Sequence, residues 1–369
     1  MAGLPNYSDN PIVSGNSGQT GDKSMEVALA SKMQLILDQP MADVDSGLTN
    51  RDFEGDFFRI GDTVALVKPD ISSLNIQFGT INTPNKVGKP ITGEAVGTLT
   101  ATDRYSNKDA RLRPTNVEFE KNVLVIDKYA KYAFYISDFT EAEGKWNYES
   151  GNLDAVAQEM RKRHNLETVQ LIVDNTSDGS APFGQIKTIA SSTAAAPITV
   201  ANGDDVYEKV IVPIFAQLYD AGAITADGQI TYGSNAQEGK TTYGCVYVPT
   251  ALYTMLLTSK YLQDRSTVAA DEKVKSGKVK TVMGLDIAIE PSLNPTAKRH
   301  INLGENTNTL VVVAGTRNLV TKAGKVLPPE RLRSLKFFAN EFHGCELYTK
   351  QVVEPDAGAV AFVKINAGA

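Results

Sequence analysis

The stretch from residue 57 to residue 138 constrains the fold most, because two strand-like segments enclose a region that cannot build a core. Phe57–Val64 at its start and Val123–Asp138 at its end both have strand character. Between them, roughly from Asn82 to Phe119, the chain is polar, rich in glycine and poor in large apolar residues. An isolated two-stranded ribbon is at best marginally stable in water. The sequence therefore predicts an extended two-stranded arm that lies on another surface, for which a neighbouring copy of the same chain is the obvious candidate.

The second of these strands alternates between apolar and polar residues. Its even positions share one face of a strand, because successive side chains point to opposite sides; they are Leu124, Ile126, Ala130, Tyr132, Phe134 and Ile136, and only Lys128 interrupts the series. Such alternation predicts a sheet with one buried face.

The order of these elements resembles that of tailed-bacteriophage major capsid proteins with the Hong Kong 97-type fold. In that family a Gly-Asp-Thr-Val strand leads into a long extended loop, an Ile-Asp-Lys strand returns, and an aromatic strand that ends at Asp precedes a long spine helix. The matching segments here are Gly61–Val64, Ile126–Lys128, Tyr132–Asp138 and the helical pattern after Tyr148. A second block is also similar: the strand-like Val246–Thr250, a short helix over Ala251–Leu257, and the apolar strand Val279–Glu290.

The resemblance implies an α+β capsid fold with five parts. We expect an N-terminal arm and short helix at residues 1–48, with a helical pattern over Met25–Asp38, and an extended loop with its flanking strands at residues 49–138. A peripheral subdomain with the spine helix would cover residues 139–199, an axial α/β subdomain residues 200–325, and return strands of the peripheral subdomain residues 326–369.

The resemblance also implies the function of a coat protein and not that of an enzyme. Many copies would assemble as hexamers and pentamers into an icosahedral head shell around double-stranded DNA, without sequence-specific binding. Scaffold, portal and decoration proteins are further partners in such a system. The protein would belong to the virion and would assemble in the host bacterial cytoplasm. No catalytic, cofactor or metal site is expected.

Composition agrees with a folded chain of more than one subdomain. The chain has 369 residues, which exceeds the size at which one hydrophobic core usually stops growing. Its net charge of −6 implies no large basic field for nucleic acid. No apolar run is long enough to span a membrane, and no secretion signal begins the sequence. The two cysteines, Cys245 and Cys345, predict buried thiols in strands and no disulfide framework.

Apolar spacing predicts the remaining elements. Glu149–Asp174 is the longest helical pattern, and Asp204–Ala221 is a second helix that Asp205 helps to cap, that Pro213 kinks or splits, and that Gly222 ends. The expected strands are Asp62–Lys68, a short one near Gln185–Ile189, Gly244–Val248, Thr309–Ala314, Leu335–Val353 and Val360–Ile365, and Pro249 is expected to start the helix that follows the third of them.

Several motifs approach known chemistry without matching it. Gly233–Thr241 resembles a phosphate-binding loop but has five residues between its glycines, where the motif has four. Asp174–Gly179 resembles the start of a calcium loop whose twelfth position, Gln185, is not the required Glu. The three histidines, His164, His300 and His343, have no metal-ligand spacing. His343 and Cys345 would share a strand face, so a catalytic dyad there stays open, although a packed strand pair is the simpler interpretation.

Two charged segments are candidate contact surfaces. At the arm, Pro114 closely follows four cations that would form salt bridges to an adjacent subunit: Arg104, Lys108, Arg111 and Arg113. The alternative is a solvated loop tip. In the long helix, Arg161–His164 is interpreted as a solvated face, with contact to a neighbour or to DNA as the alternative. Lys86 and Lys89 could in principle form the Lys–Asn bond of some family members, but nothing identifies a partner and the bond is not predicted.

Three other functions remain open from sequence alone. The first is the shell of an encapsulin-like nanocompartment, which shares the capsid fold, and the long arm argues against it. The second is an α+β enzyme with a site built from scattered residues. The third is a tail or portal component, which would form rings or tubes.

Overall fold

The computed structural model describes residues 44–54, 61–69, 119–138, 148–177, 181–226, 244–262, 279, 281–304, 306, 308–334 and 338–366. The chain divides into two compact units, residues 63–124 and the rest, and each is described by itself. Several predicted features lie outside the described residues: the helix Met25–Asp38, Lys86 and Lys89, the arm cations Arg104, Lys108, Arg111 and Arg113, and the loop Gly233–Thr241.

In the smaller unit, β2 (Thr63–Pro69) pairs with β3 (Phe119–Val125) in a two-stranded sheet. The strand predicted over Asp62–Lys68 is therefore confirmed. The two paired strands are about fifty residues apart in sequence, as expected for the base of a long excursion, and the segment that joins them lies outside the described residues.

The larger unit contains a five-stranded sheet centred on β13 (Ala339–Val352), which confirms the strand predicted over Leu335–Val353. Along one edge β13 pairs antiparallel with β12 (Glu330–Arg333) and then with β11 (Val320–Val326). Along its other edge it pairs antiparallel with β4 (Lys128–Ser137) over ten residue pairs. β1 (Thr49–Glu54) extends the sheet by pairing parallel with β11. Sequence analysis did not predict β1, β11 or β12.

The alternation predicted for the strand after residue 124 is present on β4. Ile136 is 6% exposed and its neighbour Tyr135 is 72% exposed, so one face of the strand is buried. The prediction of one continuous strand is wrong, because β3 ends at Val125 and β4 begins at Lys128. Between them the Ile126 carbonyl accepts from the Gly61 N–H (2.9 Å) and the Ile126 N–H donates to the Asp62 carbonyl (3.1 Å). After this point the chain changes partner and pairs with β13.

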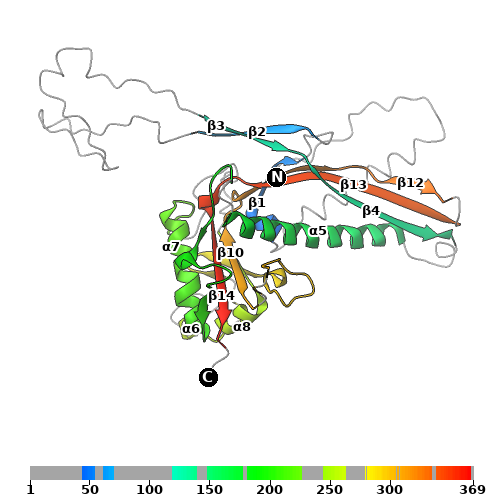
Figure 1. The fold of residues 1–369 in the computed structure, drawn as a ribbon. Helices are drawn as coiled ribbons and strands as arrows, with labels where there is room; N and C mark the ends of the chain where they lie inside the picture. Colours follow the sequence, from blue (N-terminus) through cyan, green and yellow to red (C-terminus); the bar gives the residue numbers. More distant parts are fainter. Residues whose placement is uncertain are drawn as a thin grey trace, which may run out of the picture. The chain divides into compact units, whose positions relative to one another are not determined.

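The long helix α5 (Tyr148–Asn175) confirms the helix predicted over Glu149–Asp174 and runs beside β4 and β13 (Figure 1). Its first apolar stripe, Leu153, Ala157 and Met160, packs in a cluster with side chains of β4. Its second stripe packs in another cluster with the short helix α2 (Val44–Leu48), whose Val44 and Leu48 are fully buried. The chain just before residue 49 is therefore part of the folded core.

A seven-stranded sheet forms the rest of the larger unit, in the order β5-β14-β10-β7-β9-β8, with β6 also beside β14. The strands are β5 (Lys187–Thr188), β6 (Ile198–Val200), β7 (Cys245–Val248), β8 (Thr281–Val282), β9 (Leu285–Ile289), β10 (Leu310–Gly315) and β14 (Gly358–Ile365). β10 is buried at every position because both faces of the sheet are covered.

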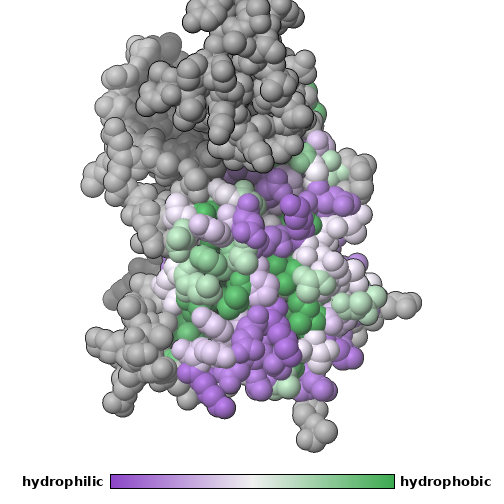
Figure 2. Space-filling view, turned by 90° about the vertical axis from the view of Figure 1, so that its left-hand side faces the viewer, coloured by the Kyte–Doolittle hydropathy of each residue, from purple (hydrophilic) through white to green (hydrophobic). Residues whose placement is uncertain are grey.

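Helices cover this sheet, and one side contributes to a core cluster with α6 (Gly203–Val206), α7 (Val212–Asp220) and α8 (Thr250–Leu256). A π-helical turn, Tyr207–Ile211, joins α6 to α7 just before Pro213, and the junction residues Val206, Ile211 and Val212 keep right-handed helical backbone angles. The interruption predicted at Pro213 is therefore a π-helical turn within one continuous helix and not a split. Figure 2 shows the side of the molecule with α6 and α7, where hydrophobic side chains gather in patches bordered by hydrophilic ones. Short 3-10 turns complete the described chain at Ile189–Ser191, Lys260–Leu262, Pro291–Leu293 and Pro355–Ala357.

The two ends of this helix, Gly203–Asp220, follow capping rules with one change from the prediction. The N-cap residue is Asn202, whose Oδ1 accepts from the Asp205 N–H (2.8 Å), while the Asp205 carboxylate accepts from the Ala201 N–H (2.9 Å). Gly222 has a φ of +70° and follows the C-cap, as predicted. Pro249 is the N-cap of α8, which begins at Thr250, one residue after the start expected at Pro249.

The two sheets do not follow the division expected at residue 326. β11, which ends at Val326, belongs to the five-stranded sheet, whereas β14 pairs antiparallel with β10 in the seven-stranded sheet (Figure 1). The last strand of the chain therefore returns to the sheet of residues 187–315. No helix in the described part of the chain has the length and apolar character needed to cross a membrane.

Candidate functional site: a buried charge network

Lys350, on β13, is the centre of a buried charge network between the five-stranded sheet and α5. Its ammonium lies 2.6 Å from Asp45 Oδ1, 2.8 Å from Thr168 Oγ1 and 3.0 Å from the His164 carbonyl. An ammonium has three N–H donors, and all three have acceptors here. The Lys350 side chain is fully buried, so these bonds replace water completely.

Asp45 comes from α2 and joins this short helix to the rest of the network. Its Oδ1 also accepts from the Thr168 hydroxyl (2.6 Å), and its Oδ2 accepts from the Arg51 guanidinium (2.6 Å). The Asp45 N–H donates to the Asn165 side chain (3.2 Å). Residues from α2, β1, α5 and β13 thus converge on one carboxylate.

Glu346 forms the second half of the network. It lies four residues before Lys350 on β13, on the same face of the strand. Its Oε1 lies 2.9 Å from the Lys322 ammonium of β11, and its Oε2 lies 2.7 Å from His164 Nε2. All three side chains are buried. Both carboxylate oxygens therefore have charged or N–H partners, as a buried charge requires.

The charges set the protonation states. Burial alone would raise the pKa of Asp45 and of Glu346, but the nearby ammonium groups, Lys350 for Asp45 and Lys322 for Glu346, hold both pKa values well below the usual range. Burial, followed by the charges of Lys322 and Lys350, lowers the pKa of His164 below its usual 6.5. At neutral pH the carboxylates are therefore ionised and His164 is neutral, with its proton on Nε2 facing Glu346.

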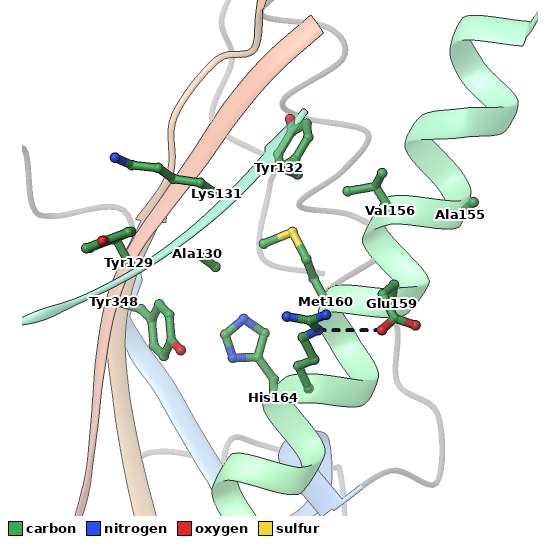
Figure 3. A pocket seen from close by; sticks show the side chains of 11 residues that line it. Tyr129, Ala130, Lys131, Tyr132, Ala155, Val156, Glu159, Met160, His164 and Tyr348 are labelled. Carbon is green, nitrogen blue, oxygen red and sulfur yellow. Dashed lines mark hydrogen bonds and ion pairs between the residues drawn. The ribbon is translucent and has the colours of Figure 1, made fainter. Parts of the chain in front are cut away.

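A pocket with a volume of about 530 Å³ lies next to the network, between β4 and α5 (Figure 3). His164 and Tyr348 reach into it from α5 and β13, and their rings meet edge to face at a centroid distance of 4.7 Å. The Tyr348 hydroxyl donates to Glu167, whose carboxylate also bonds the Lys128 ammonium at 2.7 Å. Lys128, the one break in the apolar alternation of β4, is thus explained by an ion pair with α5.

The network predicts a stability change in mildly acid solution that depends on His164. The folded-state pKa of His164 is below the unfolded value, so the unfolded chain binds more protons as pH falls from about 6.5, and the free energy of unfolding falls with it. We expect His164→Gln to remove this slope between pH 7 and pH 5 in urea unfolding. His300→Gln, at an exposed histidine outside the network, should keep it; equal slopes in both variants would contradict the assignment.

The structure changes the interpretation of several predicted residues. Lys162 and Arg163 are solvated as predicted, but Arg161 and His164 are buried, so the reading of this run as a solvated face is wrong for two of four residues. His343 Nε2 lies 3.4 Å from Glu341, and the Cys345 thiol bonds weakly to the Glu346 carbonyl, so the structure gives these two residues separate partners. Burial raises the pKa of Cys345, which disfavours a thiolate nucleophile.

The other near-matches are structural where they are described. Asn175 ends α5, and its side chain accepts from the Ile186 N–H (2.9 Å), so the first part of the calcium-like segment is a helix end and a turn. Cys245 and Cys345 take part in no disulfide and are partly buried in strands, close to the prediction of buried thiols. Among the described residues no group of His, Cys, Asp or Glu has the arrangement of a metal site.

Sequence reasoning missed Asp45, Lys322, Glu346 and Lys350. The only local signal is that Lys322, Glu346 and Lys350 stand within strands otherwise rich in apolar or uncharged residues, a pattern that usually marks an exposed face. Their mutual neutralisation depends on α5 and α2, which come from distant parts of the chain. Because every donor of Lys350 and both oxygens of Glu346 are bonded internally, the arrangement acts as a cross-link between elements and leaves these groups unavailable to a substrate.

No protein-family model matches the sequence, and no curated protein matches it. The structure, in contrast, is similar to that of a chain from Mycobacterium phage Che8, at 15% sequence identity and a TM-score of 0.54, over 88% of this chain and 91% of that chain. It is also similar to the capsid structure of the cyanophage P-SCSP1u, at 14% identity and a TM-score of 0.50, over 87% of both chains. The predicted mixed fold of the phage capsid type is therefore confirmed as an overall fold.

Proposed function

We propose that this chain is the major capsid protein of a tailed bacteriophage and that many copies form the closed head shell around double-stranded DNA. The observation that carries the proposal is the shared fold, which spans nearly the whole chain and nearly the whole phage chain from Che8. The match covers 88% of this chain, so the shared fold accounts for most of its residues. The charge network agrees with a structural role, because it holds the long helix on the sheet and the donors of Lys350 and the oxygens of Glu346 are bonded within the protein.

Contacts between copies would use surfaces on more than one part of the chain. Hydrophobic patches lie on the side that carries α6 and α7 (Figure 2), and Tyr219 of α7 is 50% exposed. Large exposed apolar patches on a protein surface commonly mark sites of contact with other proteins. In the proposed shell, this side of the axial part would face other subunits of a hexamer or pentamer.

The proposal is tested by electron microscopy and light scattering of the purified protein. Closed isometric particles, or hexamers and pentamers that convert to them, are the expected result. Particles that enclose DNA when produced with the phage would separate a virion shell from a nanocompartment, which holds protein cargo. A monomer or dimer under every assembly condition, or open tubes and rings, would contradict a shell protein.

The arm cations give a second test of assembly. We propose that Arg104, Lys108, Arg111 and Arg113 form salt bridges to an adjacent subunit, so changing all four to Glu should raise the protein concentration needed for assembly by tenfold or more. Each exposed pair contributes only about 0–1 kcal/mol, but symmetry repeats it at every interface. The free energy of unfolding of the unassembled subunit should change by less than about 0.5 kcal/mol.

The matched control reverses four exposed cations elsewhere: Lys162, Lys260, Lys298 and Lys364. Both variants have the same net charge, so a general effect of charge on assembly would appear equally in the two. An equal loss of assembly in the control would show that the arm cations have no specific partner. Assembly is measured by light scattering over a range of concentrations and salt.

A further inference from the structure

The pocket between β4 and α5 has the composition of a ligand site. Its walls are largely apolar, with Ala130 from β4 and Val156 and Met160 from α5, and its volume of about 530 Å³ lies in the range of small-molecule sites. Charged side chains of Lys131, Glu159 and Arg163 also line it, and Arg163 Nε lies 3.5 Å from Glu159 Oε1.

Two buried polar atoms of this pocket lack a hydrogen-bond partner in the described part of the chain: His164 Nδ1 and the Tyr132 hydroxyl. His164 is 4% exposed, and its ring faces the pocket on the side of Met160 (Figure 3). Glu167 Oε2 lies 3.9 Å from Nδ1, too far for a hydrogen bond. Leaving a buried polar atom without a hydrogen bond destabilises the protein, because the atom has lost its water and gained no partner. A group that enters the pocket and donates a hydrogen bond to Nδ1 would supply that partner.

The protonation state of His164 determines which chemical group can form a hydrogen bond with its Nδ1. Its Nε2 must carry the proton, because the Glu346 carboxylate 2.7 Å away can only accept. In the neutral ring Nδ1 is then an acceptor, which disfavours carboxylate and phosphate ligands. A cation is also disfavoured, because burial, followed by the charges of Lys322 and Lys350, lowers the pKa of His164 in spite of the opposing effect of Glu346. A neutral donor on an apolar body remains.

We propose that this pocket binds a neutral aromatic hydroxyl compound, with a phenol as the representative ligand, whose ring packs on Val156 and Met160 and whose O–H donates to His164 Nδ1. Tyr132, on the β4 side of the pocket, offers a second hydroxyl to a ligand that extends beyond one ring. Burial, with a smaller contribution from Cys345, raises the pKa of Tyr132 to about 12, so this hydroxyl stays protonated.

The phenol group could come from a free small molecule or from a tyrosine side chain of another copy of this chain. Both sources offer the same chemical group to the pocket. They differ in the assembly state in which the pocket can bind a free phenol. A free ligand can bind before and after assembly. A tyrosine from a neighbouring copy would occupy the pocket only in an assembled particle and would then exclude a free phenol.

The test uses p-cresol, which has the tyrosine side-chain structure, and the full-length unassembled protein. Binding is measured by calorimetry and by the ¹⁵N signal of His164 Nδ1, which should shift upfield when Nδ1 accepts a hydrogen bond. Val156→Trp should fill the pocket and weaken binding at least tenfold, whereas Lys162→Trp, on an exposed position of the same helix, should not change it. If Val156→Trp does not fold, Ala155→Trp at the exposed edge of the pocket replaces it.

Saturable binding that shifts the His164 signal and is lost in the filled variant supports the proposal. Binding to both unassembled and assembled protein then identifies a free ligand, and binding to unassembled protein alone identifies a tyrosine of another copy. No saturable binding, or binding that Val156→Trp and Ala155→Trp leave unchanged, overturns it and leaves a pocket that holds water. The unassembled protein alone decides the main question, so the result does not depend on whether a shell forms.

Discussion

Replacing Lys350 with methionine is expected to lower the free energy of unfolding of the unassembled subunit by about 3–5 kcal/mol, because removal of one partner strands a buried charge. Methionine fills much of the same volume, so the loss reflects charge and hydrogen bonding more than packing. Asp45 would keep its bond to Arg51 but lose its 2.6 Å contact with the ammonium. The Thr168 hydroxyl and the His164 carbonyl would lose a buried donor as well. Urea denaturation at pH 7 measures the change.

The matched control is Lys364→Met, at an exposed lysine of β14, which should change the free energy of unfolding by less than about 0.5 kcal/mol. The double variant Asp45→Asn/Lys350→Met should cost less than the sum of the single changes, since neither charge is then left alone. Additive losses would show that the two residues do not stabilise each other. A loss below 1 kcal/mol in Lys350→Met would contradict the geometry of the network.

The sequence predicted the elements whose signal is local. The apolar alternation on residues 128–137, the long helix and the buried strand β10 all follow from spacing that a short window contains. The π-helical turn before Pro213 likewise follows from a single local residue. β1 and β12 have weak signals, because they contain charged residues at Arg51, Glu330 and Arg331 and lie in the sheet only through pairing with distant strands. Local pattern alone does not reveal such pairing.

The charge network was beyond sequence reasoning for a related reason. A lysine in a strand normally indicates a solvated face, and Lys350 is buried only because Asp45, 305 positions earlier in the chain, reaches it from α2. The sequence predicted that His164 belongs to a charged, solvated run of α5. In the structure its side chain instead contacts Glu346 and Tyr348 of β13. Burial of a charge is a tertiary property, so it requires the packing of helix on sheet to be known first.

The same network gives the proposed capsid subunit a mechanical property. It links α2 at Asp45, the long helix α5 and the strands β11 and β13 of the five-stranded sheet through buried hydrogen bonds and ion pairs. In a shell whose subunits rotate against one another, these elements would therefore move together as a rigid body. Substitutions in the network should then alter particle stability even though no network residue needs to touch another subunit.

The last prediction concerns Gly203, at the start of α6, where there is no room for a side chain. A Cβ at this position would lie 2.1 Å from the Met255 carbonyl oxygen, in α8, and 2.8 Å from the Ser259 backbone nitrogen, three residues after α8 ends. Backbone atoms cannot move aside as a flexible side chain can, so Gly203→Ala must push the two helices apart. This close approach also positions the Asp204 carboxylate to accept from the Ser259 hydroxyl (2.9 Å) and the Lys260 N–H (2.7 Å).

We expect Gly203→Ala to lower the free energy of unfolding by about 1–3 kcal/mol, the usual cost of an overpacked contact. Gly151→Ala is the matched control, because Gly151 is near the start of α5 and a Cβ there meets nothing within 4 Å. That change should leave stability equal or raise it by up to about 1 kcal/mol, since alanine favours a helix more than glycine does. Opposite signs in the two variants would assign the Gly203 effect to the contact between α6 and α8, whereas equal losses would assign it to a general intolerance of substitution at helix starts.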